Sequence, residues 1–100
     1  MKQILFAAAF ILAANMAVAD RPAETLYNQS CIACHASGAA GAPRTGDVAA
    51  WQKKLDEKGM EKLVANTRQG INGMPPKGMC MDCTDSEFEA LIKLMAKPAN

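Results

Sequence analysis

Two cysteines and a histidine stand together in the run Cys31-Ile32-Ala33-Cys34-His35 of this 100-residue chain. Cysteines three positions apart lie on one side of a helical turn, so both sulfurs are able to add to the two vinyl groups on one edge of a porphyrin. The histidine that follows is carried beneath the ring, where its imidazole reaches the iron. The run is typical of covalent haem attachment, with Cys31 and Cys34 as anchors and His35, the only histidine in the chain, as an axial iron ligand.

A second iron ligand is expected in the run Met74-Pro75-Pro76-Lys77-Gly78. Two successive prolines exclude a helix interior and hold the backbone extended, so a stiff loop presents Met74. A thioether held in this way suits the sixth position of a haem iron. Other methionines have simpler roles, because each falls on an apolar helix face, beside a glycine or next to a cysteine: these are Met60, Met79, Met81 and Met95.

A second C-x-x-C, formed by Cys80 and Cys83, is followed by Thr84 where a haem site would have histidine. A second haem is therefore not expected. In an exported protein the pair forms a small disulfide loop, with a catalytic dithiol as the lesser alternative. A zinc module built from all four cysteines is disfavoured because the two pairs are too far apart in the chain, and a thiol enzyme would not account for the Met-Pro-Pro run.

The start of the chain has the pattern of a secretory signal. Lys2 precedes an almost wholly apolar stretch that ends in Ala17-Val18-Ala19, directly before Asp20. This pattern predicts a signal peptide over residues 1–19 and one domain over residues 20–100. A membrane anchor is the alternative, but the apolar stretch is shorter than the roughly 20 residues that cross a bilayer. Export places the four cysteines in an oxidising compartment.

Charge and size restrict the classes of function. Once Lys2 is removed with the signal, ten basic residues face ten acidic ones, without a basic patch for nucleic acid or a block of like charge. A domain this small is marginally stable unless something staples it. A haem held by two thioethers would be such a staple, so the apo-protein is expected to be poorly folded.

Helical segments are expected to position the haem motif from its N-terminal side. The first begins near Arg21-Pro22 and runs into the motif, with Leu26 and Tyr27 packed on the haem or on another helix. Residues 36–47 are expected to form a loop, because glycine and proline recur in them. In this loop the carbonyl of Pro43 is a candidate acceptor for the second ring nitrogen of the motif histidine, with a plain turn as the alternative.

Three further helices are expected after the loop. Asp47 caps one that carries Trp51, a packing residue whose indole N–H is available to a polar group such as a haem carboxylate. Charged residues of mixed sign between 53 and 62 are interpreted as solvated surface. A short helix over 60–69 follows, and the last begins at the capping box Thr84-Asp85-Ser86-Glu87. Its apolar residues repeat with helical spacing and should pack on the first helix: Phe88, Leu91, Ile92 and Met95.

Four runs in this order make the chain resemble the class I c-type cytochromes, and among them a monohaem cytochrome c5. They are the haem motif, Gly41-Ala42-Pro43-Arg44, the Met-Pro-Pro-Lys-Gly run and the second C-x-x-C. The resemblance covers essentially all of residues 20–100. It implies an all-α, small cytochrome c fold of about four short helices wrapped around one covalently attached haem c. It also implies His35 and Met74 as axial ligands and a disulfide between Cys80 and Cys83.

The function implied by this resemblance is soluble, periplasmic transport of single electrons between membrane-linked or periplasmic redox proteins, with no small-molecule substrate. Two ligands that stay bound leave no open position on the iron, so an enzyme is not expected. A haem enzyme or gas-binding sensor with a labile sixth ligand is the alternative. We expect a monomer, with a dimer through the exposed haem edge as the alternative. A small apolar rim over residues 36–42 is the expected docking contact.

Overall fold

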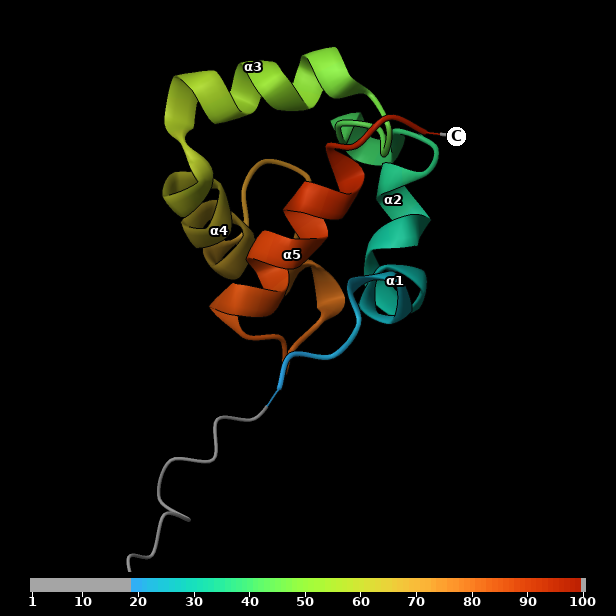
Figure 1. Ribbon diagram of the computed structural model, residues 1–100, viewed down its shortest axis with the longest axis vertical. Coiled ribbons are helices and arrows are strands. Elements are labelled where there is room, and N and C mark those ends of the chain that lie inside the picture. The colour runs from blue at the N-terminus through green and yellow to red at the C-terminus, as the bar shows by residue number, and fades with distance from the viewer. Residues whose placement is uncertain (1–18, 100) are drawn as a thin grey trace, which may run out of the picture.

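The computed structural model describes residues 19–99. Helix α5 runs through the middle of the molecule, and the other helices lie around it (Figure 1). The long helices are α3 (Val48–Lys58), α4 (Met60–Gln69) and α5 (Asp85–Met95). The first helical segment consists of α1 (Ala23–Leu26) and α2 (Ile32–His35), joined by a π-helical turn over Tyr27–Cys31. Short 3₁₀ turns cover Ala39–Gly41 and Pro76–Met79. The described part of the chain contains no β-strand beyond one isolated bridge, so the all-α prediction is confirmed.

The predicted signal peptide lies outside the described residues, apart from its last residue. In the part of the chain that the structure describes, no helix combines the length and the apolar character needed to cross a membrane.

Helix α5 begins where the capping box predicts. The Thr84 hydroxyl accepts a hydrogen bond from the Glu87 backbone N–H at 3.1 Å, and the Glu87 carboxylate accepts one from the Thr84 N–H at 3.0 Å. The apolar face of the helix is buried, with exposed fractions of 2–4% for Phe88, Leu91, Ile92 and Met95. Burial stabilises the fold by about 1.5–3 kcal/mol for each such side chain. The first helical segment packs on this face as expected, and Leu26 is fully buried there.

The N-terminal end of the described chain is bound to the start of α5 by Arg21. Its backbone N–H, Nε and Nη2 each donate to the Glu87 carboxylate at 2.9 Å, and its Nη1 donates to Asp82 at 3.1 Å. We call this set of contacts the Arg21 clamp. Glu87 is only 3% exposed, and the hydrogen bonds from Arg21 and Thr84 hold the pKa of its carboxyl well below its usual range. The same carboxylate therefore caps α5 and anchors the N-terminal segment.

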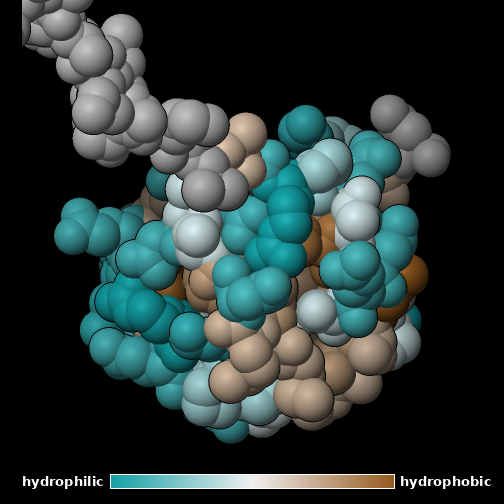
Figure 2. Space-filling view, turned by 90° about the horizontal axis from the view of Figure 1, so that it is seen from below, coloured by the Kyte–Doolittle hydropathy of each residue, from teal (hydrophilic) through white to brown (hydrophobic). Residues whose placement is uncertain are grey.

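Helices α3 and α4 follow each other with only Gly59 between them. Asp47 caps α3 as predicted, since its carboxylate accepts from the Ala50 backbone N–H at 3.1 Å. Gly59 has a φ of +82°, a conformation that glycine adopts without a steric cost. The chain turns there, so that α3 runs across the top of the molecule and α4 descends beside α5 (Figure 1). The lower side of the molecule combines a large hydrophilic area with a broad area of moderately hydrophobic residues, and smaller strongly hydrophobic spots lie between hydrophilic atoms (Figure 2).

Candidate haem-binding site

A cavity lies among α2, α3, α4, α5 and two loops, and four of the six predicted site residues line it. It holds about 1240 Å³ of space without protein atoms, part of which is open to solvent. Cys31, Cys34 and His35 reach it from the first helical segment, and Met74 reaches it from the loop after α4. The structure therefore brings together the residues predicted to attach a haem and to bind its iron. The other two predicted residues, Cys80 and Cys83, do not line this cavity.

The two cysteines of the haem motif are free thiols, each half-buried at the cavity wall. Burial raises the pKa of the Cys31 thiol, because a thiolate is poorly solvated there. The π-helical turn ends at Cys31, and the helix returns to α-helical geometry at Ile32. Such a turn is wider than an α-helical one and occurs frequently at functional sites. The sequence carries no pattern from which we could predict it.

His35 is the last residue of α2 and is 6% exposed. Its Nδ1 lies 2.7 Å from the carbonyl oxygen of Pro43. A carbonyl oxygen only accepts hydrogen bonds, so Nδ1 carries the proton and Nε2 keeps the lone pair that a metal ion requires. Of the two roles considered for Pro43, the structure supports the hydrogen-bond acceptor.

The loop after α2 is held against His35 by further hydrogen bonds. The Thr45 backbone N–H donates to the His35 carbonyl at 2.8 Å, and the Tyr27 and Thr45 hydroxyls lie 2.8 Å apart. Trp51 packs beside His35 with its ring centroid 5.7 Å from the imidazole, and its Nε1 donates to the Arg44 carbonyl at 2.9 Å. The indole N–H therefore reaches a polar group, as predicted, and that group is a loop carbonyl rather than a haem carboxylate. This hydrogen bond steadies the loop.

Met74 is half-buried and lies in a loop whose backbone closes on itself. Ile71 and Met74 exchange two backbone hydrogen bonds, of 3.0 and 2.8 Å. Gly78, with a φ of +55°, passes so close that a Cβ there would lie 2.8 Å from the Met74 Cε. A side chain at this position would compete with the thioether for space, so the glycine makes room for the methionine.

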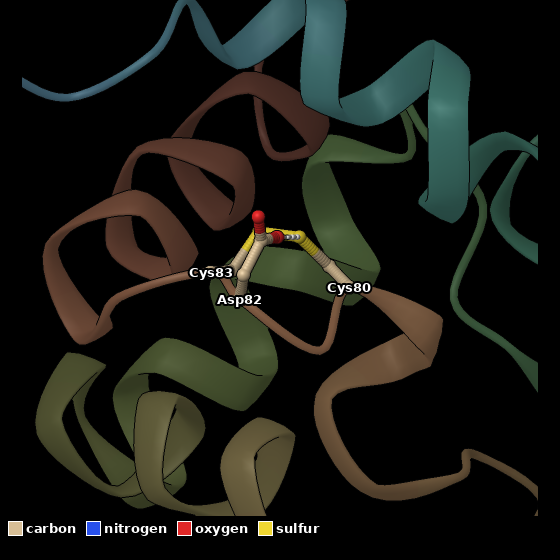
Figure 3. A group of neighbouring side chains, drawn as sticks. All are labelled: Cys80, Asp82 and Cys83. Atoms are coloured by element: carbon tan, nitrogen blue, oxygen red, sulfur yellow. Dashed lines mark hydrogen bonds between the residues drawn. A yellow bond between two sulfur atoms is a disulfide. The ribbon is translucent and has the colours of Figure 1, made fainter.

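Cys80 and Cys83 are joined as a disulfide in the structure, with their Cα atoms 5.4 Å apart (Figure 3). Asp82 lies between them in the chain, and its Oδ1 is 3.8 Å from the Cys80 sulfur. These three side chains have the proximity of a metal site, but sulfurs joined to each other are not available as thiolate ligands. The disulfide loop leads directly into the cap of α5, and its Asp82 is part of the Arg21 clamp.

Two lysines that the sequence did not single out also line the cavity. The interpretation of the charged residues between 53 and 62 as solvated surface is wrong for Lys54, which is half-buried at the cavity wall. Lys58, one turn later, lines the cavity but remains exposed. Their positions relative to Trp51, three and seven residues on, are the signal that could have found them, because this spacing places all three on one face of a helix.

The chemistry of the cavity fits a haem. Two thiols are available for the vinyl groups, and the His35 imidazole and the Met74 thioether are available as iron ligands. Apolar side chains of α5 suit the faces of a porphyrin, and they line the cavity at Phe88, Leu91, Ile92 and Met95.

Comparison with known proteins gives concordant results. Residues 18–95 match the family model described as cytochrome c oxidase, cbb3-type, subunit III. The chain is 41% identical to cytochrome c5 of Ectopseudomonas mendocina over 85 residues, which cover 84% of this chain and 98% of that protein.

Two solved structures are similar to the whole described domain. A mono-haem ferrocytochrome c from Shewanella putrefaciens is 40% identical, with a TM-score of 0.69 and coverage of 82% of this chain and 100% of that one. A chain of an electron transfer complex of nitrite reductase with cytochrome c is 37% identical, with a TM-score of 0.66 and coverage of 78% and 95%.

Proposed function

Because the chain belongs to the cytochrome c family, whose members carry one covalently bound haem c, we propose that it is a periplasmic electron carrier with His35 and Met74 as axial iron ligands. It is an electron-transfer protein and not an enzyme. The observation that carries the proposed ligation is the convergence of Cys31, Cys34, His35 and Met74 on one cavity.

Cys31 and Cys34 are the proposed attachment points. Their sulfurs line the same cavity as His35, and neither is engaged in a disulfide. Thioether bonds from these two cysteines would hold the haem so that it could not dissociate. The surrounding side chains would then pack on it as they would on a core.

His35 and Met74 are the proposed axial ligands. The hydrogen bond to Pro43 fixes the His35 tautomer and leaves Nε2 for the iron. Met74 offers a sulfur that needs no deprotonation, from a loop shaped by two prolines and by the close approach of Gly78. Ligands that remain bound in both oxidation states keep the rearrangement on electron transfer small.

When bound, the haem supplies a one-electron couple between Fe(II) and Fe(III). The protein biases this couple through its side chains. The Met74 thioether is a soft ligand that favours the reduced iron, and the buried face of α5 excludes water from one wall of the site. Both effects raise the reduction potential.

We also propose that residues 1–19 are an export signal, that residues 20–100 are the mature domain, and that the Cys80–Cys83 disulfide forms in the periplasm. Support comes from the sequence pattern before Asp20 and from the position of the two sulfurs in the structure. Mass spectrometry of the exported protein tests both ideas. It should give a mass for residues 20–100 plus one haem, minus two hydrogens, and alkylation under denaturing conditions should find no reactive thiol.

The proposed partners are membrane-linked and periplasmic redox proteins that contact the monomer briefly. One similar chain was solved in an electron transfer complex with nitrite reductase, which supports a protein partner of this class. Part of the cavity mouth is small or apolar, with exposed residues at Ala39, Ala40, Gly41 and Met79. A contact limited to such a rim buries little surface and dissociates quickly, as a carrier requires.

Optical spectra of the purified holoprotein test the ligation. The wild-type protein should show a covalently bound, low-spin haem, with a sulfur-to-iron charge-transfer band in the oxidised state. Met74→Ala should lose this band and should bind carbon monoxide in the reduced state.

The matched control is Met81→Ala, since Met81 is 66% exposed and does not line the cavity. It should retain the wild-type spectrum. A wild-type protein that is already high-spin, or that binds carbon monoxide readily, would contradict the proposed ligation and favour the sensor or enzyme interpretation.

A further inference from the structure

The charged side chains that line the cavity are lysines from a single helix. Among its lining residues there is no aspartate, glutamate or arginine. The titratable groups on the wall are the two thiols and the imidazole of the haem motif, and two lysines of α3, Lys54 and Lys58. The loop after α4 and helices α4 and α5 contribute no titratable lining residue. A ligand in the cavity thus meets positive charge from one direction only.

The two lysines lie on the face of α3 that begins with Trp51. Residues 51, 54 and 58 share one side of the helix, and Trp51 lies against His35 at the other end of this row. The lysines therefore extend along the cavity away from the proximal ligand. Helix α4 contributes Asn66 to the same cavity, and its side-chain amide is a neutral hydrogen-bond donor.

Lys54 has no compensating charge in the structure. No described residue forms an ion pair or a side-chain hydrogen bond with Lys54 or Lys58. Lys58 lies in the last turn of α3, where the helix dipole already favours a cation. Lys54 lies in the middle of the helix and is half-buried beside an apolar cavity, where an unpaired ammonium group costs free energy. That cost falls if an anion occupies the cavity.

Other donors near the cavity are already engaged. The Trp51 indole donates to the Arg44 carbonyl, and the Arg44 side chain donates twice to the carbonyl of Ser37. The indole N–H is thereby engaged, and Arg44 does not line the cavity. The lysines of α3 are the charged donors that remain.

We propose that Lys54, with Lys58 beside it, binds the carboxylates of the two propionate side chains of the haem. This inference rests on the proposed function. The thioether edge of the ring is committed to Cys31 and Cys34, so the carboxylates must leave from another edge. Pairing them with Lys54 keeps them ionised and offsets their negative charge near the iron, which favours Fe(II) and raises the potential.

Redox titration of the holoprotein with Lys54→Gln tests this role. The matched control is Lys53→Gln, which removes the same charge from an exposed position outside the cavity wall. At a fixed solution potential, Lys54→Gln should raise the Fe(III)/Fe(II) ratio by about threefold, or roughly 28 mV for a one-electron couple, with a smaller change for Lys53→Gln. The pH range over which the reduction potential changes should also lie higher for Lys54→Gln than for the wild type. The reason is that an unpaired carboxylate takes up its proton more readily.

Lys54→Arg distinguishes charge from packing. It should retain the wild-type potential, because the positive charge remains. If Lys54→Gln fails to take up haem while Lys54→Arg takes it up normally, the carboxylate role is supported. If both fail alike, or if Lys54→Gln and Lys53→Gln have the same potential and pH profile, the inference is overturned. Absence of covalent haem from the wild type would instead overturn the proposed function.

Discussion

The two sides of the haem cavity hold their proposed iron ligands by different means. On one side His35 ends a helix, its ring bonds to Pro43, and the following loop is tied to it through Thr45 and Trp51. On the other side no hydrogen bond within residues 19–99 orients the Met74 side chain. Its position follows from the shape of the backbone, which has positive φ values at several positions: Gly70, Asn72, Lys77, Gly78 and Met79.

This difference follows from the chemistry of the two ligands. An imidazole has a second nitrogen, so a hydrogen bond can orient it, whereas a thioether is a weak acceptor that only packing can direct. The histidine side should therefore tolerate loss of one contact, since several hold the same loop. On the methionine side, a change in the space around the Met74 side chain should disrupt its ligation of the iron. The following variants test this contrast, beginning with the one that abolishes it.

Removing both attachment points should have the largest effect. Without covalent haem the cavity is left unfilled in a small domain whose core depends on it, so both sides should lose their structure. We expect the Cys31→Ala, Cys34→Ala variant to lose most of its helical circular dichroism and its cooperative unfolding. Native-like helicity without haem would show that the polypeptide alone determines the geometry of both sides.

Adding one carbon to the methionine side should displace its ligand. Gly78→Ala places a Cβ against the Met74 Cε, so the sulfur-to-iron band should be lost and carbon monoxide should bind. Gly59→Ala is the control, because Gly59 also has positive φ but a Cβ added there would have no neighbouring atom within 4 Å. Gly78→Ala should lose roughly 1–2 kcal/mol of unfolding free energy from its left-handed backbone. Gly59→Ala should lose about 1–3 kcal/mol, because its φ of +82° and ψ of 157° lie in a region that is essentially restricted to glycine. Equal spectra in the two would refute steric control of Met74.

Removing one contact from the histidine side should cost stability and leave ligation intact. Trp51→Phe deletes the hydrogen bond to the Arg44 carbonyl while retaining an aromatic ring beside His35. We expect urea unfolding to show a loss of about 1 kcal/mol with an unchanged low-spin spectrum. Tyr27→Phe, which deletes the contact with the Thr45 hydroxyl, serves as a second probe of the same loop. A high-spin iron in either variant would mean that the loop has no redundancy.

The Arg21 clamp should have the smallest effect on the iron, since it lies on neither side. Ionised Glu87 has a lowered pKa, so its stabilising contribution is fully present above the unfolded pKa near 4.5 and is lost as pH falls toward the folded value. Glu87→Gln should therefore destabilise the holoprotein at neutral pH and lessen its loss of stability in acid, with unchanged visible spectra. Thermal unfolding measured against pH tests this. If the thermal stability of Glu87→Gln fell as steeply in acid as that of the wild type, carboxylates other than Glu87 would account for the acid sensitivity.

Local rules account for most of what the sequence predicts correctly. The capping box at Thr84, the cap at Asp47 and the apolar repeat of α5 depend on residues a few positions apart, and the structure confirms all three. The haem motif is equally local, and its resemblance to known cytochromes extends the prediction to Met74.

Features that no local residue pattern marks were missed. The donor from Trp51 goes to a loop carbonyl that no pattern marks, and Lys54 resembles a surface residue because its neighbours are charged. The π-helical turn before Ile32 and the close approach of Gly78 to Met74 are features of backbone geometry that no residue pattern marks. Sequence patterns therefore predict which residues carry the chemistry of this site better than they predict which charged residues surround it.

The Arg21 clamp also sets an order of events. It joins residues 66 positions apart, so the clamp cannot form until the chain as far as Glu87 has been synthesised. Until then the first helical segment lacks this contact with α5. On the proposed export route, the thiols of Cys31 and Cys34 would therefore be presented before the clamp has closed.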